Sequence, residues 1–313
     1  MKSAILWTLN GGLGNQIFQY LASIYIQENL DIDYVQYTAS DYIQQGYRAL
    51  DLSRLASIKL SMHDSESLSP YLRLKRKLSR CVYSSTFAHN DWLPRWLTFA
   101  KAYLNEAQFA DKYSNSLEKL SLFLEIHSSK VKTFCIEGYW QNPSLYINSL
   151  RRWHSLFQLS ASYLPHEWKD ISYLSIHVRR GDYLDPSGYE FFFSKFHPVQ
   201  YLQHALQLVP TELQFLPVVV VTDDRSWAEH HMSLLLGDKT FFIYSSEDPL
   251  VDWSLLNNSS FSIICNSTFS FTAAMLNYRS SSQRYRVIMP QWITSQDSCI
   301  SKGWDTLPGS IVI

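Results

Sequence analysis

The residues "NGGLGNQIFQY" at positions 10–20 indicate an α/β unit at the start of the chain. They follow an apolar run at residues 4–7 and include three glycines, Gly11, Gly12 and Gly14. Glycine adopts backbone angles that are closed to other residues, so the chain turns sharply here and lets a ligand or another backbone approach. Apolar residues then recur at helical spacing and predict a helix from about Asn15 to Asn29. The amide groups at the start of this helix form a seat for an anion.

Apolar runs that alternate with helical patterns predict an α/β fold with parallel sheets. The expected strands are residues 4–8, 32–37, 133–138, 173–178, 218–222, 240–244, 261–265 and 286–289. A chain of 313 residues is long enough for two domains, each with its own core. We place the boundary between residues 160 and 161, in a polar, proline-containing segment between Trp153 and Asp170.

Composition excludes several classes of protein. The charges nearly balance, with 27 Lys and Arg against 28 Asp and Glu, so nothing favours nucleic acid as a partner. The 4 cysteines form no C-x-x-C pair, which indicates neither a zinc site nor a disulfide scaffold. No apolar run approaches the roughly 18 residues that a membrane span needs, and the first strand begins too early for a signal peptide. We therefore expect a cytoplasmic protein.

A basic segment, "YLRLKRKLSR" at residues 71–80, lies in the least readable part of the chain, residues 60–130. We interpret it as the solvated face of a helix, because a run of charge alone is weak evidence for a site. The alternative is contact with anionic lipid headgroups, helped by Trp92 and Trp96. On that alternative the protein is peripheral to the cytoplasmic membrane.

The segment "LSIHVRRGDYLD", residues 174–185, carries the strongest chemical signal. A buried strand delivers His177, Arg179, Arg180 and Asp182 to its carboxyl end, where open α/β sheets bind their ligands. Two adjacent guanidinium groups repel each other unless an anion or a carboxylate lies between them. A diphosphate matches them, because arginine donates in a planar fork and stays charged. A structural Arg–Asp pair that braces the loop accounts for one arginine, but not for both.

Polar residues also follow other expected strands. In "FSIICNSTFSFTAAMLN", residues 261–277, the side chains of Asn266, Ser267 and Thr268 stand at a helix start, where they cap the helix or bind phosphate. The run "VVVVTDD", residues 218–224, places Asp223 where it takes up a ribose hydroxyl or caps a helix. Asp252 either accepts hydrogen bonds from guanine or is an ordinary N-cap.

Three of these stretches together resemble the bacterial α-1,2-fucosyltransferase family. They are "GGLGNQIFQY" (residues 11–20), "SIHVRRGDY" (residues 175–183) and "IICNSTFSF" (residues 263–271). Two further segments are similar to motifs of that family, "EGYWQNPSLY" at residues 137–146 and "VVTDDRSW" at residues 220–227. The resemblance spans nearly the whole chain, and five motifs in the family's order make it specific.

The resemblance implies a GT-B fold, in which two Rossmann-like domains face each other across a cleft. It assigns an acceptor-side domain to residues 1–160 and a GDP-fucose-binding domain to residues 161–313. The implied reaction transfers L-fucose from GDP-fucose to the 2-hydroxyl of a galactose, with inversion at the anomeric carbon, without metal or cofactor. The implied acceptor is a β-galactoside at the end of a lipid-linked bacterial glycan precursor, as in O-antigen biosynthesis. A D-x-D pattern at residues 31–33 is interpreted as structural, because it lies far in sequence from the arginines.

The family's roles carry over to matching positions of this sequence. Arg179 and Arg180, with the hydroxyls of Ser267 and Thr268, meet the charge on the leaving phosphate. Asp182 is the first choice as general base, with Glu137 and His177 as alternatives; His177 is otherwise a positioning residue or a buried structural histidine. The remaining donor contacts expected are Gly12, Gly14, Asn15, Gln16, Asp223, Asp252 and Asn266.

Two departures from the family pattern concern apolar positions. The family commonly has Trp-Trp-Gly where residues 271–273 are Phe-Thr-Ala, and it tends to have Met where Leu256 precedes Asn257. Neither change touches the phosphate donors. Another nucleotide-sugar glycosyltransferase and a non-catalytic sugar-binding protein on the same fold remain alternatives. A dinucleotide-dependent dehydrogenase is disfavoured, because the glycine segment lacks G-x-G-x-x-G spacing.

Overall fold

The computed structural model of the chain describes residues 4–30, 35–46, 49–55, 60–62, 99–106, 117–128, 131–147, 163–277, 286–307 and 309–313. Packing divides the chain into two units, Met1–Ser53 with Lys59–Asn142 and Arg54–Ile58 with Pro143–Ile313. Helix α6 (Pro143–Ile147) belongs to the second unit, because it packs against the short helix η6 (Trp304–Thr306). The boundary expected between residues 160 and 161 lies outside the described residues and stays a prediction. The different roles expected of the two domains stay predictions.

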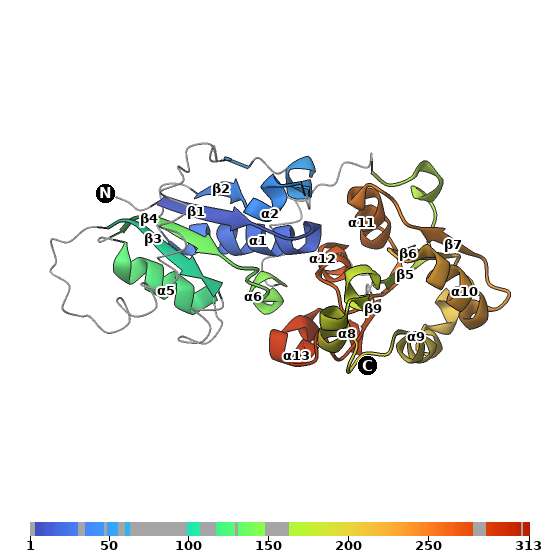
Figure 1. The fold of residues 1–313 in the computed structure, drawn as a ribbon. Coiled ribbons are helices and arrows are strands. Elements are labelled where there is room, and N and C mark those ends of the chain that lie inside the picture. The colour runs from blue at the N-terminus through green and yellow to red at the C-terminus, as the bar shows by residue number, and fades with distance from the viewer. Residues whose placement is uncertain are drawn as a thin grey trace. The chain divides into compact units, whose positions relative to one another are not determined.

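The first unit contains a parallel sheet with strand order β2-β1-β4-β3 (Figure 1). Its strands are β1 (Ala4–Leu9), β2 (Val35–Ala39), β3 (Phe99–Asn105) and β4 (Val131–Glu137). Its helices are α1 (Leu13–Asn29), α2 (Asp41–Gln44), α5 (Leu117–His127) and η1 (Asp51–Arg54). All six residues of β1 are buried, as expected of a central parallel strand, and α1 packs on this strand and against α5.

The second unit contains a larger parallel sheet, with strand order β10-β9-β8-β5-β6-β7. Its strands are β5 (Leu174–Val178), β6 (Val218–Thr222), β7 (Phe241–Tyr244), β8 (Phe261–Ile263), β9 (Arg286–Met289) and β10 (Ser310–Val312). Read from β7 and numbered along the chain within this unit, the strand order is 3-2-1-4-5-6, which is that of a doubly wound Rossmann sheet. In such a sheet, strands 2 and 3 lie on one side of strand 1 and strands 4 to 6 lie on the other, so the switch point lies between strands 1 and 4. In this unit that switch point lies between β5 and β8.

Helices cover both faces of this second sheet. They are α8 (Pro186–Phe192), α9 (Pro198–Gln207), α10 (Arg225–Leu236), α11 (Pro249–Asn257), α12 (Thr268–Asn277) and α13 (Cys299–Lys302). Short helical turns are η3 (His166–Trp168), η4 (Gly181–Leu184) and η5 (Thr211–Leu213). On one face, Val218 and Val220 of β6 join α9 and α10 in a hydrophobic core. Helix α11 packs on β5 and β6 and against α12, and none of its residues belongs to that core.

The predicted α/β fold with parallel sheets is confirmed, and most expected strands are found with ends that differ by one to three residues. Residues 218–222 and 286–289 match without change. The strand expected at 261–265 ends earlier, at Ile263, because the amide of Ser267 turns back to the carbonyl of Cys265. Strands β3 and β10 were not predicted: β3 lies in the poorly readable region, and β10 is only three residues long.

Candidate active site

The arginine segment and the acidic segment meet at the carboxyl edge of the second sheet. Strand β5 pairs with β6 in a register that sets Val178 beside Thr222. The residues that follow, Arg179 and Arg180 on one strand and Asp223 and Asp224 on the other, therefore come together. This edge includes the switch point, which is where doubly wound sheets bind their ligands.

Arg179 lies between two carboxylates. Its Nη2 atom donates to Oδ1 of Asp182 at 2.7 Å, and its Nη1 atom lies 2.8 Å from Oδ2 of Asp223. The guanidinium group also lies over the ring of Tyr183, at 5.8 Å from the ring centre. Burial acts to lower the pKa of Arg179, but the charges of Asp223 and Asp182 outweigh it and raise the pKa. Arg179 is therefore a fixed, permanently positive group.

Arg180 has carboxylate partners of its own. Its Nε atom donates to Oδ2 of Asp224 at 2.9 Å, its side chain lies 4.7 Å above the ring of Trp227, and its backbone amide donates to Oδ1 of Asp223 at 2.8 Å. Asp224 also caps α10 through the amide of Trp227 at 3.0 Å. The expectation that structural pairing accounts for only one arginine is thus wrong, because Asp182, Asp223 and Asp224 supply carboxylates to both.

Gly181 allows this cluster to close. A Cβ atom at this position would come within 2.5 Å of Oδ2 of Asp223. Gly188 of α8 has a similar role, since its Cβ would come within 2.4 Å of the carbonyl oxygen of Asp182. Two glycines therefore let β6 and α8 approach the arginine loop from different sides.

His177 is a buried, neutral histidine. It is 4% exposed, its Nδ1 atom lies 3.0 Å from Sγ of Cys265, and its ring lies 5.6 Å from that of Phe269. Burial lowers the pKa of His177 to about 3, with a smaller contribution from the charge of Arg179. This environment disfavours His177 as a general base and favours a structural or positioning role.

The residues before α12 mostly serve the fold. Asn266 is 2% exposed, and its Nδ2 atom donates to the carbonyls of Phe192 at 3.0 Å and Ile293 at 3.2 Å. The hydroxyl of Ser267 accepts from the amide of Phe269 at 3.3 Å and so caps the helix. The direct donor contacts expected of Asn266 and Ser267 have no support in these buried positions. Thr268 opens α12 and is half-buried, so it is the better placed of the three.

Asp252 is buried within α11 and is not its N-cap. The N-cap is Asp248, which accepts from the amide of Leu250 at 3.0 Å. Both carboxylate oxygens of Asp252 accept from the amide of Ser246, at 3.1 and 3.2 Å. Burial raises the pKa of Asp252 to about 7, against the Ser246 hydrogen bonds, which lower it. The N-cap interpretation is therefore wrong, and the guanine contact stays a prediction.

The glycine segment of the first unit follows β1, at the switch point between β1 and β4. Gly11 has a φ of +76°, whereas Gly12 has a φ of −76° and is the N-cap of α1. Gly14 lies inside the helix. Of these three glycines, only Gly11 needs the left-handed region, and a Cβ at Gly12 would meet no atom within 4 Å. Gly12 therefore leaves the backbone at the helix start open to a ligand.

Gln16 is a buried brace rather than a surface contact. It is 0% exposed, and its Nε2 atom donates to the carbonyls of Gly11 and Ala49, both at 2.8 Å. Its Oε1 atom accepts from the amide of Leu52 at 3.0 Å. The prediction of a donor contact by Gln16 thus lacks support. Asn15 lies beside it, and its Oδ1 atom accepts from Nε2 of Gln141 at 3.1 Å.

Two further residues shape this edge of the first sheet and were missed from the sequence. Gln19 accepts from the amide of Asn10 at 2.9 Å and donates to the carbonyl of Gly138 at 3.0 Å. Glu106 follows β3 and accepts from the amide of Tyr139 at 2.6 Å. Glu106 follows Asn105, whose register partner at the end of β4 is Glu137. A carboxylate directly after a strand would have indicated Glu106 as a site residue, but strand β3 was not recognised from the sequence.

Several predictions fall outside the described residues, namely those on the D-x-D pattern at 31–33, the basic run at 71–80, Trp92 and Trp96. Within the described ranges, no group of three or more His, Cys, Asp or Glu side chains is arranged to hold a metal ion. Across the same part of the chain, we find no helix with the length and apolar character needed to traverse a bilayer.

A family model, two curated relatives and a solved structure are similar to most of this chain. A model described as "Glycosyl transferase family 11" matches residues 4–304. The O-antigen biosynthesis glycosyltransferase WbnK of Escherichia coli is 25% identical over 295 residues, which cover 86% of this chain and 89% of that protein. An alpha-1,2-colitosyltransferase of Escherichia coli is 25% identical over 292 residues, which cover 88% of this chain and 89% of that protein. An Arabidopsis thaliana FUT1 mutant solved with GDP has a similar fold, with a TM-score of 0.51, 14% identity, and coverage of 90% of this chain and 72% of that chain.

Proposed function

Because the chain belongs to glycosyltransferase family 11, we propose that it is a galactoside α-1,2-fucosyltransferase that uses GDP-fucose and inverts the anomeric carbon. The observation that carries the proposal is the arginine pair at the carboxyl edge of β5, beside the switch point of a doubly wound sheet. Such a position suits the diphosphate of a nucleotide sugar. A GDP complex of a protein with a similar fold supports a GDP-linked donor.

In the proposed reaction, the leaving group binds to Arg179. As the bond between fucose C1 and the phosphate oxygen breaks, positive charge grows on the sugar and negative charge on the β-phosphate. The guanidinium group of Arg179 meets that negative charge, and Arg180 keeps the loop in place through Asp224. Thr268 and the first amides of α12 add donors from the opposite side of the switch point. These fixed donors perform the task for which other glycosyltransferases use a metal ion.

Asp182 couples donor binding to proton transfer. Its side chain is 55% exposed, whereas the side chain of Asp223, the other partner of Arg179, is 24% exposed. A phosphate oxygen therefore replaces Asp182 on Arg179 more readily than it replaces Asp223. The released carboxylate takes the proton of the acceptor 2-hydroxyl while that oxygen bonds to fucose C1 and GDP departs. Glu137 remains the alternative base, because it ends β4 at the ligand-binding edge of the first unit.

The other donor contacts in the proposal are the open backbone at Gly12, the side chain of Asn15, and Asp252 for the guanine base. Gly14 is buried inside α1, so a donor contact there lacks support. The acceptor is a β-galactoside-terminated glycan. A relative that acts in O-antigen biosynthesis supports a lipid-linked precursor at the cytoplasmic face of the membrane. The relative named as an alpha-1,2-colitosyltransferase favours a second candidate function, transfer of a different sugar through the same type of linkage.

A donor and acceptor panel tests the proposal. The purified protein is incubated with GDP-fucose and β-galactosyl disaccharides, with and without EDTA, and the product linkage is read by NMR. We expect α-1,2-linked fucose at an equal rate in both conditions. Transfer from another nucleotide sugar, but not from GDP-fucose, would establish the second candidate. Loss of activity in EDTA would contradict the metal-independent mechanism.

Arg179→Lys tests the phosphate contact directly. A lysine has the charge but not the planar fork, so we expect kcat to fall by about 100- to 1,000-fold. Arg225→Lys is the matched control, because Arg225 lies at the start of α10 with its side chain 58% exposed and paired with Glu229. The control is expected to retain the wild-type kcat. Equal kcat values for Arg179→Lys and Arg225→Lys would show that Arg179 does not contact the leaving phosphate.

A further inference from the structure

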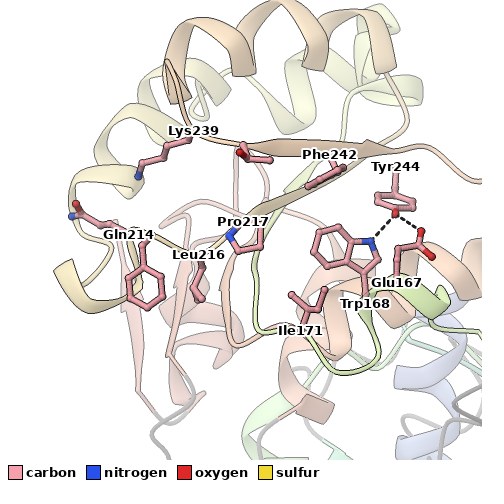
Figure 2. A pocket seen from close by; sticks show the side chains of 11 residues that line it. Glu167, Trp168, Ile171, Gln214, Leu216, Pro217, Lys239, Phe242 and Tyr244 are labelled. Carbon is pink, nitrogen blue, oxygen red and sulfur yellow. Dashed lines mark hydrogen bonds between the residues drawn. The ribbon is translucent and has the colours of Figure 1, made fainter.

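A cavity of about 570 Å³ lies in the second unit, away from the arginine cluster. Figure 2 shows Trp168 and Ile171 on one side of it and Leu216 and Pro217 on the other, below Phe242. Pro217 precedes β6, whereas the acidic residues of the active site follow it. The five-residue strand separates the two places by about 17 Å. We call this cavity the aromatic groove.

Several apolar side chains that line the aromatic groove are exposed to solvent and are not packed in the core. Phe241 and Ile243 of β7 pack against the core, so strand alternation turns Phe242 to the other face of the sheet. Phe242 is 45% exposed, Ile171 is 50% exposed and Phe215 is 79% exposed. Large aromatic side chains left in water around a concavity mark a binding site more often than a packing defect.

Hydrogen bonds and ring contacts hold Trp168, Tyr244 and Phe242 in place before any ligand arrives. Nε1 of Trp168 donates to the hydroxyl of Tyr244 at 2.6 Å, and that hydroxyl donates to Oε1 of Glu167 at 2.9 Å (Figure 2). Trp168 also makes edge-to-face contacts with Tyr173 and Phe242, at 5.0 and 5.2 Å between ring centres. Ordering these rings therefore adds little to the entropy lost on binding.

The charges around the groove disfavour an anionic ligand. The lining contains one acid, Glu167, and one base, Lys239. Beside the lining residues in sequence stand the bases His166 and Lys169. The acids Asp170, Glu212 and Asp238 stand next to or near lining residues as well, so bases do not outnumber acids there. Anionic lipid headgroups and nucleic acid both need clustered lysine and arginine. A neutral ligand suits the groove better.

A sugar suits a groove lined by exposed aromatic rings, a few polar side chains and balanced charges. The C–H faces of a pyranose pack on aromatic rings such as Phe215 and Phe242, while its hydroxyl edges bond to polar groups such as the Thr240 hydroxyl. The side-chain oxygen of Gln214 is a further acceptor, since its Nε2 atom donates to the carbonyl of Val209 at 3.1 Å. The cavity volume falls within the roughly 300–1,000 Å³ of ordinary ligand pockets. We propose that the aromatic groove binds a neutral oligosaccharide at a site separate from the transfer centre. This goes beyond the proposed function, because binding here needs no donor.

Titration calorimetry with lactose and a neutral galactose-containing tetrasaccharide tests the inference. We expect Phe215→Ala and Phe242→Ala each to weaken binding of the tetrasaccharide by about tenfold, because each removes a stacking ring. Leu234→Ala is the control, since Leu234 is 72% exposed on α10 and does not line the groove. It is expected to bind as the wild type does. Phe215 is so exposed that its replacement should leave the thermal unfolding temperature unchanged.

The outcomes separate this inference from the proposed function. Asp182→Asn is expected to slow transfer by about 100- to 10,000-fold and to leave the groove's affinity unchanged. Phe215→Ala is expected to leave hydrolysis of GDP-fucose unchanged. Equal affinities in wild type, Phe215→Ala and Phe242→Ala would overturn the inference, and so would absence of binding. A change in oligomeric state caused by Phe215→Ala would assign the groove to a second copy of the chain and would also overturn it.

Discussion

Asp182 has two partners in the proposed cycle, Arg179 before the donor binds and the acceptor hydroxyl afterwards. Asp182→Asn retains the shape of the side chain but removes the proton acceptor, so we expect kcat to fall by about 100- to 10,000-fold. GDP binding should persist, because Asp223 still holds Arg179. Single-turnover kinetics and calorimetry with GDP measure the two effects. Turnover near the wild-type rate would move the base to Glu137.

Asp252 makes stability depend on pH in an unusual direction. Its folded pKa of about 7 lies above the value of 3.8 for an unperturbed carboxyl, so the folded chain holds a proton that the unfolded chain releases. The folded state therefore loses stability as the pH rises from about 4 to 7, by on the order of 4 kcal/mol if Asp252 acts alone. Below pH 4 the carboxyl is protonated in both states, so stability no longer changes with pH there and the contribution of Asp252 is fully present.

Asp252→Asn should flatten that part of the stability curve. Urea unfolding at several values between pH 4 and 7 compares the variant with the wild type. Asp238→Asn is the control, because Asp238 is exposed and should leave the slope unchanged. If wild type and Asp252→Asn lose stability in parallel, the carboxyl of Asp252 is ionised throughout this range.

Helix α1 illustrates how one element is held by buried polar side chains rather than by capping. Its N-cap, Gly12, makes no side-chain hydrogen bond, and Gln16 and Gln19 on the first two turns fix the surrounding loops. Hydrophobic periodicity identified the helix but gave no reason to bury a glutamine. The reason is tertiary: the backbone groups of residues 10, 11, 49, 52 and 138 need partners inside the unit.

Gln16→Leu should therefore destabilise the first unit. Leucine fills a similar volume but leaves the carbonyls of Gly11 and Ala49 and the amide of Leu52 without their partner. Each such group costs about 1–3 kcal/mol, so we expect the unfolding free energy to fall by about 3 kcal/mol or more. Gln27→Leu on the exposed face of α1 is the matched control and should change little. Equal stability of the two variants in urea would refute the bracing role.

The strand ends show which parts of a site a sequence can reveal. The carboxyl end of β5 was recognisable, because a buried apolar run stopped at charged residues. The partners of those charges were not recognisable, because Asp182, Asp223 and Asp224 are brought to the arginines by the register of β5 with β6 and by the turn at Gly181. The same limit applies to Asn266, whose surface role seemed natural until its amide was found bonded to Phe192 and Ile293.

Across the molecule, the linear pattern established the α/β class, the motifs and the polar strand ends, because local periodicity and glycine placement depend on neighbours in the chain. Folding decided the division after Asn142, the carboxylates that neutralise both arginines, and the aromatic groove. Each of these joins residues that are distant in sequence, such as Trp168 and Tyr244. Such pairs form only when the strands take their register, and no local pattern encodes that step.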